Sequence, residues 1–222
     1  MYQSANRQIS SVSMRHNFDP RPVNGPFDDP GLFIPFTYES RAILFDLGDN
    51  LPLSARELLK ISHVFITHTH VDHFIGFDRF LRLILGREKK VSIYGPEGII
   101  DNVAAKLAAY SWNLVDRFKT NFQFHVTEVL SETSGRSAIF PLKDRFRLRD
   151  KNAVSFCKGV IERTNAYHVE TAVLDHRMPC LGFSLCEPIH VNVWKNRLEA
   201  LGLQVGPWLR DVKCAVVNSR SD

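Results

Sequence analysis

The sequence predicts an α/β fold, a sandwich of helices and mixed sheets. Two observations support this prediction. Up to about residue 114, short apolar runs typical of strands alternate with segments of helical spacing. Between residues 121 and 187, strand-like segments follow one another. We therefore expect mixed sheets rather than a purely parallel sheet, in one domain that 222 residues are long enough to fill.

The first expected elements surround a histidine-rich segment. Two strands are predicted at 32–40 and 41–49, and the helix at 54–60 has Ser54 and Glu57 in capping-box spacing. A strand at 61–67 precedes a helix at 74–85 that ends at Gly86, and Pro96 opens a helix after a strand at 89–95. Further strands are expected at 122–129, 145–149, 153–162, 166–175 and 180–187, and a helix at 193–202.

The chain ends and the composition indicate the domain boundaries and the cell compartment that we expect. Residues 1–17 are expected to form a disordered leader, 18–213 the folded domain and 214–222 a tail. The N-terminus lacks the apolar core of a secretory signal, and no apolar stretch approaches the roughly 18 residues that span a bilayer. The four cysteines (Cys157, Cys180, Cys186 and Cys214) show no zinc-ribbon spacing and fit a reduced, cytoplasmic protein without membrane association. The net charge of +4 alone decides nothing about partners.

The segment ITHTHVDHF, residues 66 to 74, carries the chemistry. His68, His70, Asp72 and His73 follow directly behind an apolar strand, where a hydrophobic core would not favour them. Imidazole and carboxylate are ligands suited to zinc, with manganese or iron as further candidates. In an extended segment, His68 and His70 can point to one side and share an ion. Asp72 and His73, at the turn into the next helix, can reach a second ion roughly 4 Å from the first.

Three stretches in order resemble a known family. FITHTHVDHFIGFDRFL, VSIYGPEGI and AVLDHRMPCLGFSL, with ILFDLGD upstream, are similar to the metallo-β-lactamase fold superfamily, and within it to ribonuclease Z, the tRNA 3′-processing endonucleases. The histidine motif alone specifies only the superfamily, and the three stretches together specify the branch. The resemblance covers most of residues 30 to 213 and implies an αββα sandwich with mixed sheets.

The resemblance also implies residue roles. His68, His70 and His176 would hold a first zinc ion, and Asp72 and His73 a second, with Asp72 also orienting the attacking water as general base. Asp46 would support the site through hydrogen bonds, although a structural turn explains it equally well. The implied reaction is hydrolysis of precursor tRNA by water that the metal activates, and the family is commonly homodimeric.

The family pattern continues beyond the residues present here. It resumes with an aspartate that bridges two metals and with two later histidines, and nothing after Lys213 matches them. We therefore expect a fold incomplete at its C-terminus, one well-formed metal site and exposed apolar surface.

Two segments are weaker candidates for RNA contact. Residues 190–213 resemble the family's substrate-binding arm through Gly206 and Pro207, although glycine and proline after a helix are also an ordinary chain stop. Arg145, Arg147 and Arg149 alternate with apolar residues, which predicts either a basic face beside a nuclease cleft or a charged, solvated edge strand.

Two other functions stay open at this point. A different hydrolase of the same fold, acting on a small cyclic phosphodiester, thioester or lactam, would share the histidine motif. A catalytically inactive metal-binding or RNA-binding protein would explain the unmatched downstream ligands.

Overall fold

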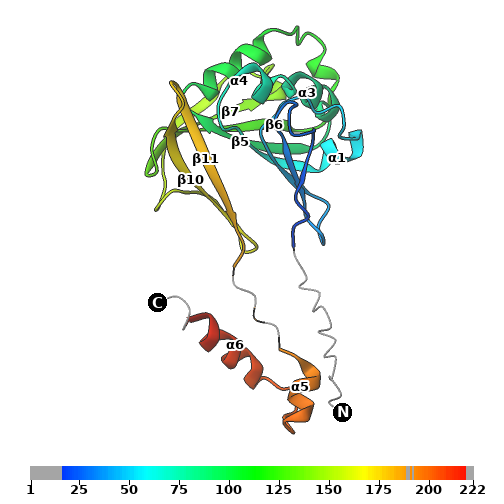
Figure 1. Cartoon of the computed structure of the whole chain (residues 1–222). Coiled ribbons are helices and arrows are strands. Elements are labelled where there is room, and N and C mark those ends of the chain that lie inside the picture. The colour runs from blue at the N-terminus through cyan, green and yellow to red at the C-terminus, as the bar shows by residue number, and fades with distance from the viewer. Residues whose placement is uncertain (1–16, 189–190, 192, 219–222) are drawn as a thin grey trace, which may run out of the picture.

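The computed structural model describes residues 17–188, 191 and 193–218. Residues 1–16 of the predicted leader and 219–222 of the predicted tail lie outside the described residues, as do residues 190 and 192 of the predicted arm. The described part contains two sheets, helices on one side of the larger sheet, and two C-terminal helices (Figure 1).

The larger sheet has eight strands in chain order. They are β1 (Arg21–Pro22), β2 (Leu32–Pro35), β3 (Ala42–Phe45), β4 (Ile61–Phe65), β5 (Lys89–Pro96), β6 (Phe122–Val129), β7 (Ser134–Pro141) and β8 (Arg149–Ser155). Strands β3 to β6 pair in parallel, whereas β1 to β3 and β6 to β8 pair antiparallel. The prediction of mixed sheets is therefore confirmed.

Helices α1 (Ala55–Lys60), α3 (Phe77–Ile84) and α4 (Ile99–Ala108) cover one face of this sheet (Figure 1). Alternate residues of the central strands point to them, for example Leu44, Val64 and Ile93, and pack against buried helix residues such as Phe80. The crossovers are helical because parallel neighbours cannot be joined by a tight turn. Helix α1 begins with the capping box predicted for Ser54.

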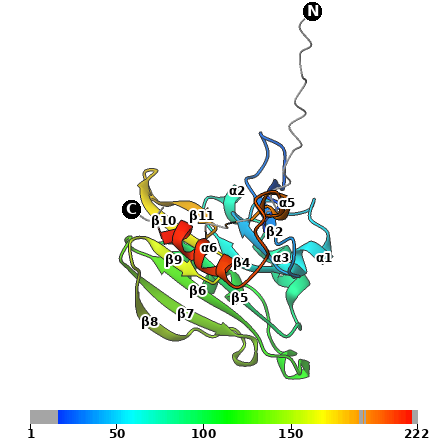
Figure 2. The same ribbon diagram turned by 90° about the horizontal axis from the view of Figure 1, so that it is seen from below.

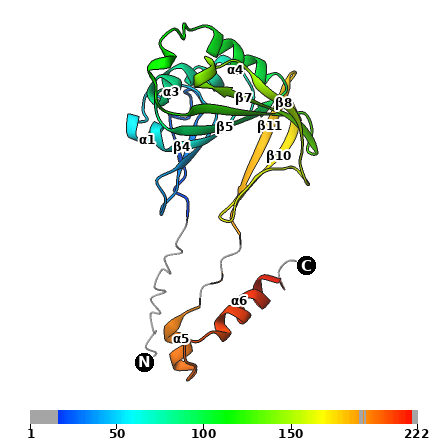
Figure 3. The ribbon, with the colours of Figure 1, turned by 180° about the vertical axis from the view of Figure 1, so that it is seen from behind.

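A three-stranded antiparallel sheet lies on the opposite face of the large sheet (Figures 1 and 3). It consists of β9 (Val160–Arg163), β10 (His168–Asp175) and β11 (Pro179–Cys186). The second core between the sheets is rich in aromatic rings, and Phe65 stacks on Tyr94 with ring centroids 4.9 Å apart. Phe183 of β11 meets Phe65 edge-on at 5.5 Å. The odd and even residues of each central strand thus serve two different cores.

Several predicted elements were wrong in extent. The helix expected at 74–85 is two helices, α2 (Val71–Phe74) and α3, separated at Gly76. The helix expected at Pro96 begins at Ile99, because β5 runs through Pro96 and Gly98 turns the chain with a φ of 92°. Strand β7 was missed, and the strand expected at 153–162 is the end of β8 and the separate strand β9.

The strand predicted at 145–149 is also wrong. Arg145 and Phe146 both have left-handed backbones, with φ of 56° and 54°, just after the short helix η2 (Leu142–Asp144). This turn inserts Phe146 into the core, where its ring lies 4.7 Å from Trp112 and 5.8 Å from Phe122. Burial of a large aromatic ring outweighs the alternation that the sequence shows. A second short helix, η1 (Val115–Arg117), precedes β6.

The C-terminal helices are α5 (Lys195–Ala200) and α6 (Trp208–Asn218), which Figures 1 and 2 show in orange and red. Helix α5 falls inside the predicted helix, and α6 continues past residue 213, where the predicted tail begins. None of the helices that the structure describes has the length and apolar character needed to cross a bilayer.

Candidate metal centre

The histidine segment leaves β4 at the carboxyl end of the parallel strands. Asp46 follows β3 at the same end, and its backbone amide donates to the carbonyl of Phe65 at 2.8 Å. The backbone amide of Ile66 donates in turn to the carbonyl of Tyr94 on β5 at 2.8 Å. Because β3 and β4 are parallel neighbours, their following loops meet at one edge, where open α/β sheets commonly bind ligands.

A hydrogen-bond network centred on Asp46 and Thr67 fixes the imidazoles of His68 and His73. The Asp46 carboxylate is 8% exposed and accepts from the Thr67 amide at 2.8 Å and from the Thr67 hydroxyl at 3.0 Å. The same hydroxyl lies 3.0 Å from Nδ1 of His68 and 3.1 Å from Nδ1 of His73. Oδ2 of Asp46 also lies 3.0 Å from Nδ1 of His73. These contacts occupy the Nδ1 atoms and leave Nε2 of both rings for other partners.

Next to this network, the imidazoles of His68, His70 and His176 converge. One ligand atom each from His68, His70 and His176 lies within 4.8 Å of the others, and Nε2 of His68 is 3.1 Å from Nδ1 of His70. His176 comes from the turn between β10 and β11 in the small sheet. Its approach is fixed by the Leu181 amide, which donates to the carbonyl of Thr67 at 2.8 Å. The structure thus brings together residues from two segments more than a hundred positions apart.

Asp72 and His73 lie within helix α2, not at a turn before a helix as the sequence predicts. Oδ2 of Asp72 is 3.7 Å from Nε2 of His73, and the Asp72 side chain is 49% exposed. Both residues fall outside the two groups of three ligand atoms that lie within 4.8 Å among the described residues. They form a pair beside the three-imidazole cluster, and their role as ligands stays a prediction.

Two glycines allow the loops of the site to touch. A Cβ on Gly48 would lie 2.4 Å from the backbone oxygen of Asp72, and one on Gly76 would lie 2.2 Å from the backbone oxygen of Gly48. Any side chain at either position would push apart the loop that carries Asp46 and the helix that carries Asp72.

The three imidazoles fit a divalent cation. Ligand atoms that share a zinc ion at about 2 Å each lie between 3 and 4 Å apart, and the observed separations require only small side-chain rotations. Burial, followed by the charges of His73 and His70, lowers the pKa of His68. A lowered pKa favours the neutral imidazole, which is the form that coordinates a metal.

A cavity of about 530 Å³ lies at the turn end of the β10–β11 hairpin, lined by Asp175 and Arg177 on either side of His176 in the sequence. Its walls come from β10, β11 and the end of β5, and the residues after His176 contribute Arg177 and Met178. Arg177 has a φ of 58°, and its backbone amide donates to Oδ1 of Asp175 at 2.8 Å. The sequence did not single out this cavity, because it forms only where the two sheets meet.

Comparison with known proteins identifies the family. A family model described as a beta-lactamase superfamily domain matches residues 41–218. The chain belongs to this superfamily. The match includes every residue of the candidate metal centre, and the architecture of the two sheets is the metallo-β-lactamase fold.

Curated relatives within the beta-lactamase superfamily carry the name ribonuclease Z. One from Deinococcus radiodurans is 31% identical over 176 residues, which are 77% of this chain and 52% of the relative. One from Methanocaldococcus jannaschii is 41% identical over 192 residues, 81% of this chain and 49% of the relative. Human tRNase Z, short form (ELAC1), aligns with a TM-score of 0.46 and 22% identity over 76% of this chain and 61% of its own. The chain spans about half the length of the curated relatives it matches.

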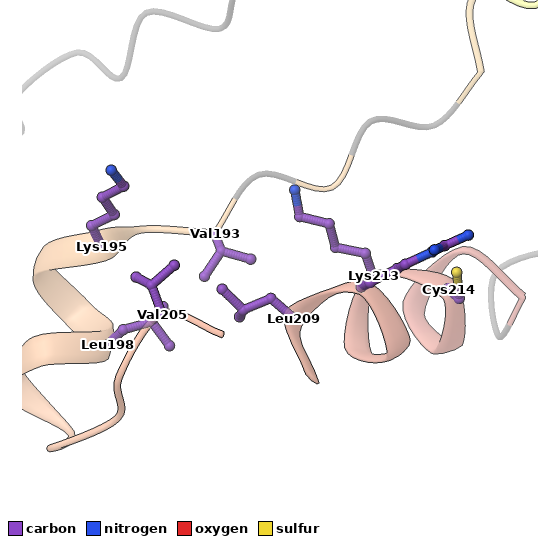
Figure 4. A pocket seen from close by; sticks show the side chains of 8 residues that line it. Val193, Lys195, Leu198, Val205, Leu209, Lys213 and Cys214 are labelled. Carbon is purple, nitrogen blue, oxygen red and sulfur yellow. The ribbon is translucent and has the colours of Figure 1, made fainter. Parts of the chain in front are cut away.

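The predicted arm corresponds to α5, α6 and the loop between them, which holds Gly206 and Pro207. Both helices face an apolar cavity of about 500 Å³, lined by Leu198, Val205 and Leu209 and rimmed by lysines 195 and 213 (Figure 4). Figure 1 shows these helices set apart from the two sheets. The predicted role of the arm in RNA binding stays a prediction.

The three arginines Arg145, Arg147 and Arg149 do not lie on the single strand that the sequence predicts, and their contact with RNA stays a prediction. Arg145, Arg147 and Arg149 follow β7, whose last residue pairs with Gln123 at the start of β6, whereas the metal centre lies level with the end of β6. The length of β6 separates the two places by roughly 20 Å. Arg149 instead begins β8, an exposed edge strand, which is the other alternative that the sequence allowed.

Thr67 is a residue of the candidate metal centre that the sequence did not predict. Its hydroxyl joins Asp46, His68 and His73, yet a threonine at a strand end has no pattern of its own. The only available signal was its position next to His68 in a segment already assigned to metal binding.

Proposed function

We propose that this chain is a metal-dependent phosphodiester hydrolase of the ribonuclease Z type, with precursor tRNA as substrate. The convergence of His68, His70 and His176 at the carboxyl ends of the parallel strands carries the proposal. The relatives named ribonuclease Z favour an RNA substrate over the small-molecule alternatives.

The proposed metal is zinc, held by these three imidazoles. When bound, the ion supplies Lewis-acid polarisation of the phosphoryl group and lowers the pKa of a water molecule. Three histidines with one open position form a ligand set typical of catalytic zinc. Asp46 and Thr67 hold the rings of His68 and His73 through Nδ1, so that Nε2 of each ring is the atom that would bind metal.

Asp72 is the proposed general base. Its half-exposed carboxylate lies at the mouth of the site in the first turn of α2, where it can orient a water molecule and accept its proton. The water oxygen forms a bond to phosphorus, the bond between phosphorus and the 3′ oxygen of the tRNA breaks, and the 3′ oxygen takes up a proton from solvent. The products are a tRNA with a 3′-hydroxyl and a trailer with a 5′-phosphate.

Positive groups near the cavity and on the C-terminal helices support RNA binding. Arg177 lines the cavity beside His176, and lysines 195 and 213 lie on α5 and α6. We propose that Arg177 contacts a phosphate of the cleaved region and that the segment with Gly206 and Pro207 binds the tRNA body. A homodimer and a cytoplasmic location complete the proposal. The thiols of Cys157 and Cys214, which are free and exposed, suit a reducing compartment.

The test measures bound zinc, cleavage of a precursor tRNA and hydrolysis of bis(p-nitrophenyl) phosphate on the same preparations. Wild type, His68→Ala and Asp72→Asn are compared, with His125→Gln as a control on β6, away from the cluster. We expect His68→Ala to lose the zinc of this centre and both activities, and Asp72→Asn to lose activity while retaining most of the zinc. Zinc binding without any hydrolysis would contradict the enzymatic proposal and favour a metal-binding protein.

A further inference from the structure

A second group of ligand side chains lies at the other end of the β10–β11 hairpin. His168 pairs directly with Cys186 across the ladder, and Glu170 pairs with Ser184. Directly paired residues of an antiparallel ladder point to the same face. The neighbouring Val169 and Leu185 belong to the core between the sheets, so His168, Glu170 and Cys186 lie on the opposite, outer face.

The three ligand atoms are already close together. Nε2 of His168 lies 3.1 Å from Oε1 of Glu170, and these atoms and Sγ of Cys186 all lie within 4.8 Å of one another. The hydroxyl of Ser184 lies 3.4 Å from the same sulfur. All three residues are partly exposed, so an ion could reach them from solvent. Small rotations would bring the atoms to the separations of 3 to 4 Å that a shared zinc ion imposes.

The donor set is selective by its chemistry. A thiolate, an imidazole and a carboxylate together match zinc, whereas magnesium and calcium prefer sites made only of oxygen. The alternative is that His168 and Glu170 only form a hydrogen bond with each other. That alternative does not account for the thiol of Cys186, which the register of the ladder places opposite His168.

We propose that His168, Glu170 and Cys186 bind a zinc ion that fastens the open end of the β10–β11 hairpin. This site is separate from the three-imidazole centre. His168 and Asp175 are the two ends of β10, and the strand between them spans roughly 25 Å. The ion would join the first residue of β10 to the last residue of β11, beyond which the chain continues towards α5. Its role is structural, because it fixes the point from which the C-terminal helices extend.

Cobalt substitution tests this proposal on the full chain without any measurement of hydrolysis. The protein is prepared as His68→Ala/His176→Ala to remove the first centre, stripped of metal, kept reduced with a phosphine and titrated with Co²⁺. A thiolate bound to Co²⁺ gives an intense charge-transfer band in the near ultraviolet. We expect one Co²⁺ per chain with this band, displaced by one equivalent of Zn²⁺.

Matched cysteine variants assign the ligand. Cys186→Ser is expected to abolish the band, whereas Cys157→Ser and Cys180→Ser keep it. His168→Gln is expected to weaken binding at least tenfold, and circular dichroism checks that each variant is folded. The proposal is overturned if the band is absent from the parent protein or survives Cys186→Ser. Weaker Co²⁺ binding in His168→Gln with the fold intact would assign His168 as a ligand, and unchanged binding would overturn that assignment.

Discussion

The two ends of the β10–β11 hairpin both present ligand groups, but the protein assembles them in different ways. At the turn, His176 meets His68 and His70 from the loop after β4, and Thr67, which Asp46 holds, supports the ring of His68. At the open end, His168, Glu170 and Cys186 come from one ladder and are placed by its register alone. A centre built from distant segments needs buried polar support, whereas a centre built from paired strands needs only correct pairing.

The largest expected effect is at the turn. His176→Ala removes the ligand that the turn of the small sheet gives to the first centre, so zinc affinity there should fall by more than about 100-fold. Competition with a chromophoric chelator measures the affinity, with His125→Gln as the matched control. An unchanged affinity would show that the sheets need not meet for this centre to form.

The second effect is a loss of stability at acidic pH, caused by His63 under strand β9, which pairs with the start of β10. His63 of β4 lies beneath β9, with Nε2 3.9 Å from Oε1 of Glu162 and a side chain only 15% exposed. Burial, followed by the charges of Arg41 and Lys90, lowers the pKa of His63 to about 4. The unfolded chain therefore binds a proton between pH 6.5 and 4 that the folded chain does not, so stability falls as the pH falls through this window. The loss should be about 3 kcal/mol.

Urea unfolding of wild type and His63→Gln at pH 7 and pH 4 measures this loss. The wild type should lose about 3 kcal/mol more than the variant between the two values, since glutamine has no proton to bind. Equal losses would assign the acid sensitivity to other groups.

Asp46→Asn should weaken zinc binding at the first centre by roughly 10- to 100-fold, as removal of a supporting carboxylate commonly does. The backbone of Asp46 is left-handed, with a φ of 56°, and asparagine tolerates this conformation. The substitution therefore removes charge without strain. Asp46→Ala, which adds strain, should lower the melting temperature further, and an effect of Asp46→Asn on cobalt binding at Cys186 would contradict the separation of the two centres.

The smallest effect is expected for Thr67→Val, which removes one hydroxyl but keeps the shape of the side chain. Zinc affinity should fall about tenfold, because Nδ1 of His68 loses its partner. Thr67→Ser retains the hydroxyl and should bind zinc like the wild type. Similar losses in both variants would point to packing of the threonine methyl group.

The sequence allowed most of the large sheet to be predicted. The strands around His68 are short, apolar and bounded by turns or helices, so local pattern and structure agree. Strand β7 was not predicted because its start, Ser134, Gly135 and Arg136, is polar and contains a glycine, which is rare in strands. The strand expected at Arg145 failed because Phe146 contacts aromatic residues from other elements.

The two candidate centres also differ in how far a local sequence pattern predicts them. His68, His70, Asp72 and His73 form a contiguous motif, and resemblance to a family added His176 and Asp46. Thr67 and the group at Cys186 were not predicted, because only strand register and loop packing bring their partners together. Pairing across a ladder is not visible in a single sequence unless the turn between the strands fixes it.

The docking of the small sheet has a consequence for local opening. Its contacts with the large sheet include the aromatic and aliphatic side chains of the second core, the contacts of Glu162 with Tyr94 and His63, and the backbone bond from Leu181 to Thr67. The hairpin can therefore separate as a unit at a lower free energy than global unfolding. An ion held jointly by His68 and His176 would oppose that separation. Amide hydrogen exchange in β10 and β11 should then slow when zinc is added, while exchange in β5 and β6 stays the same.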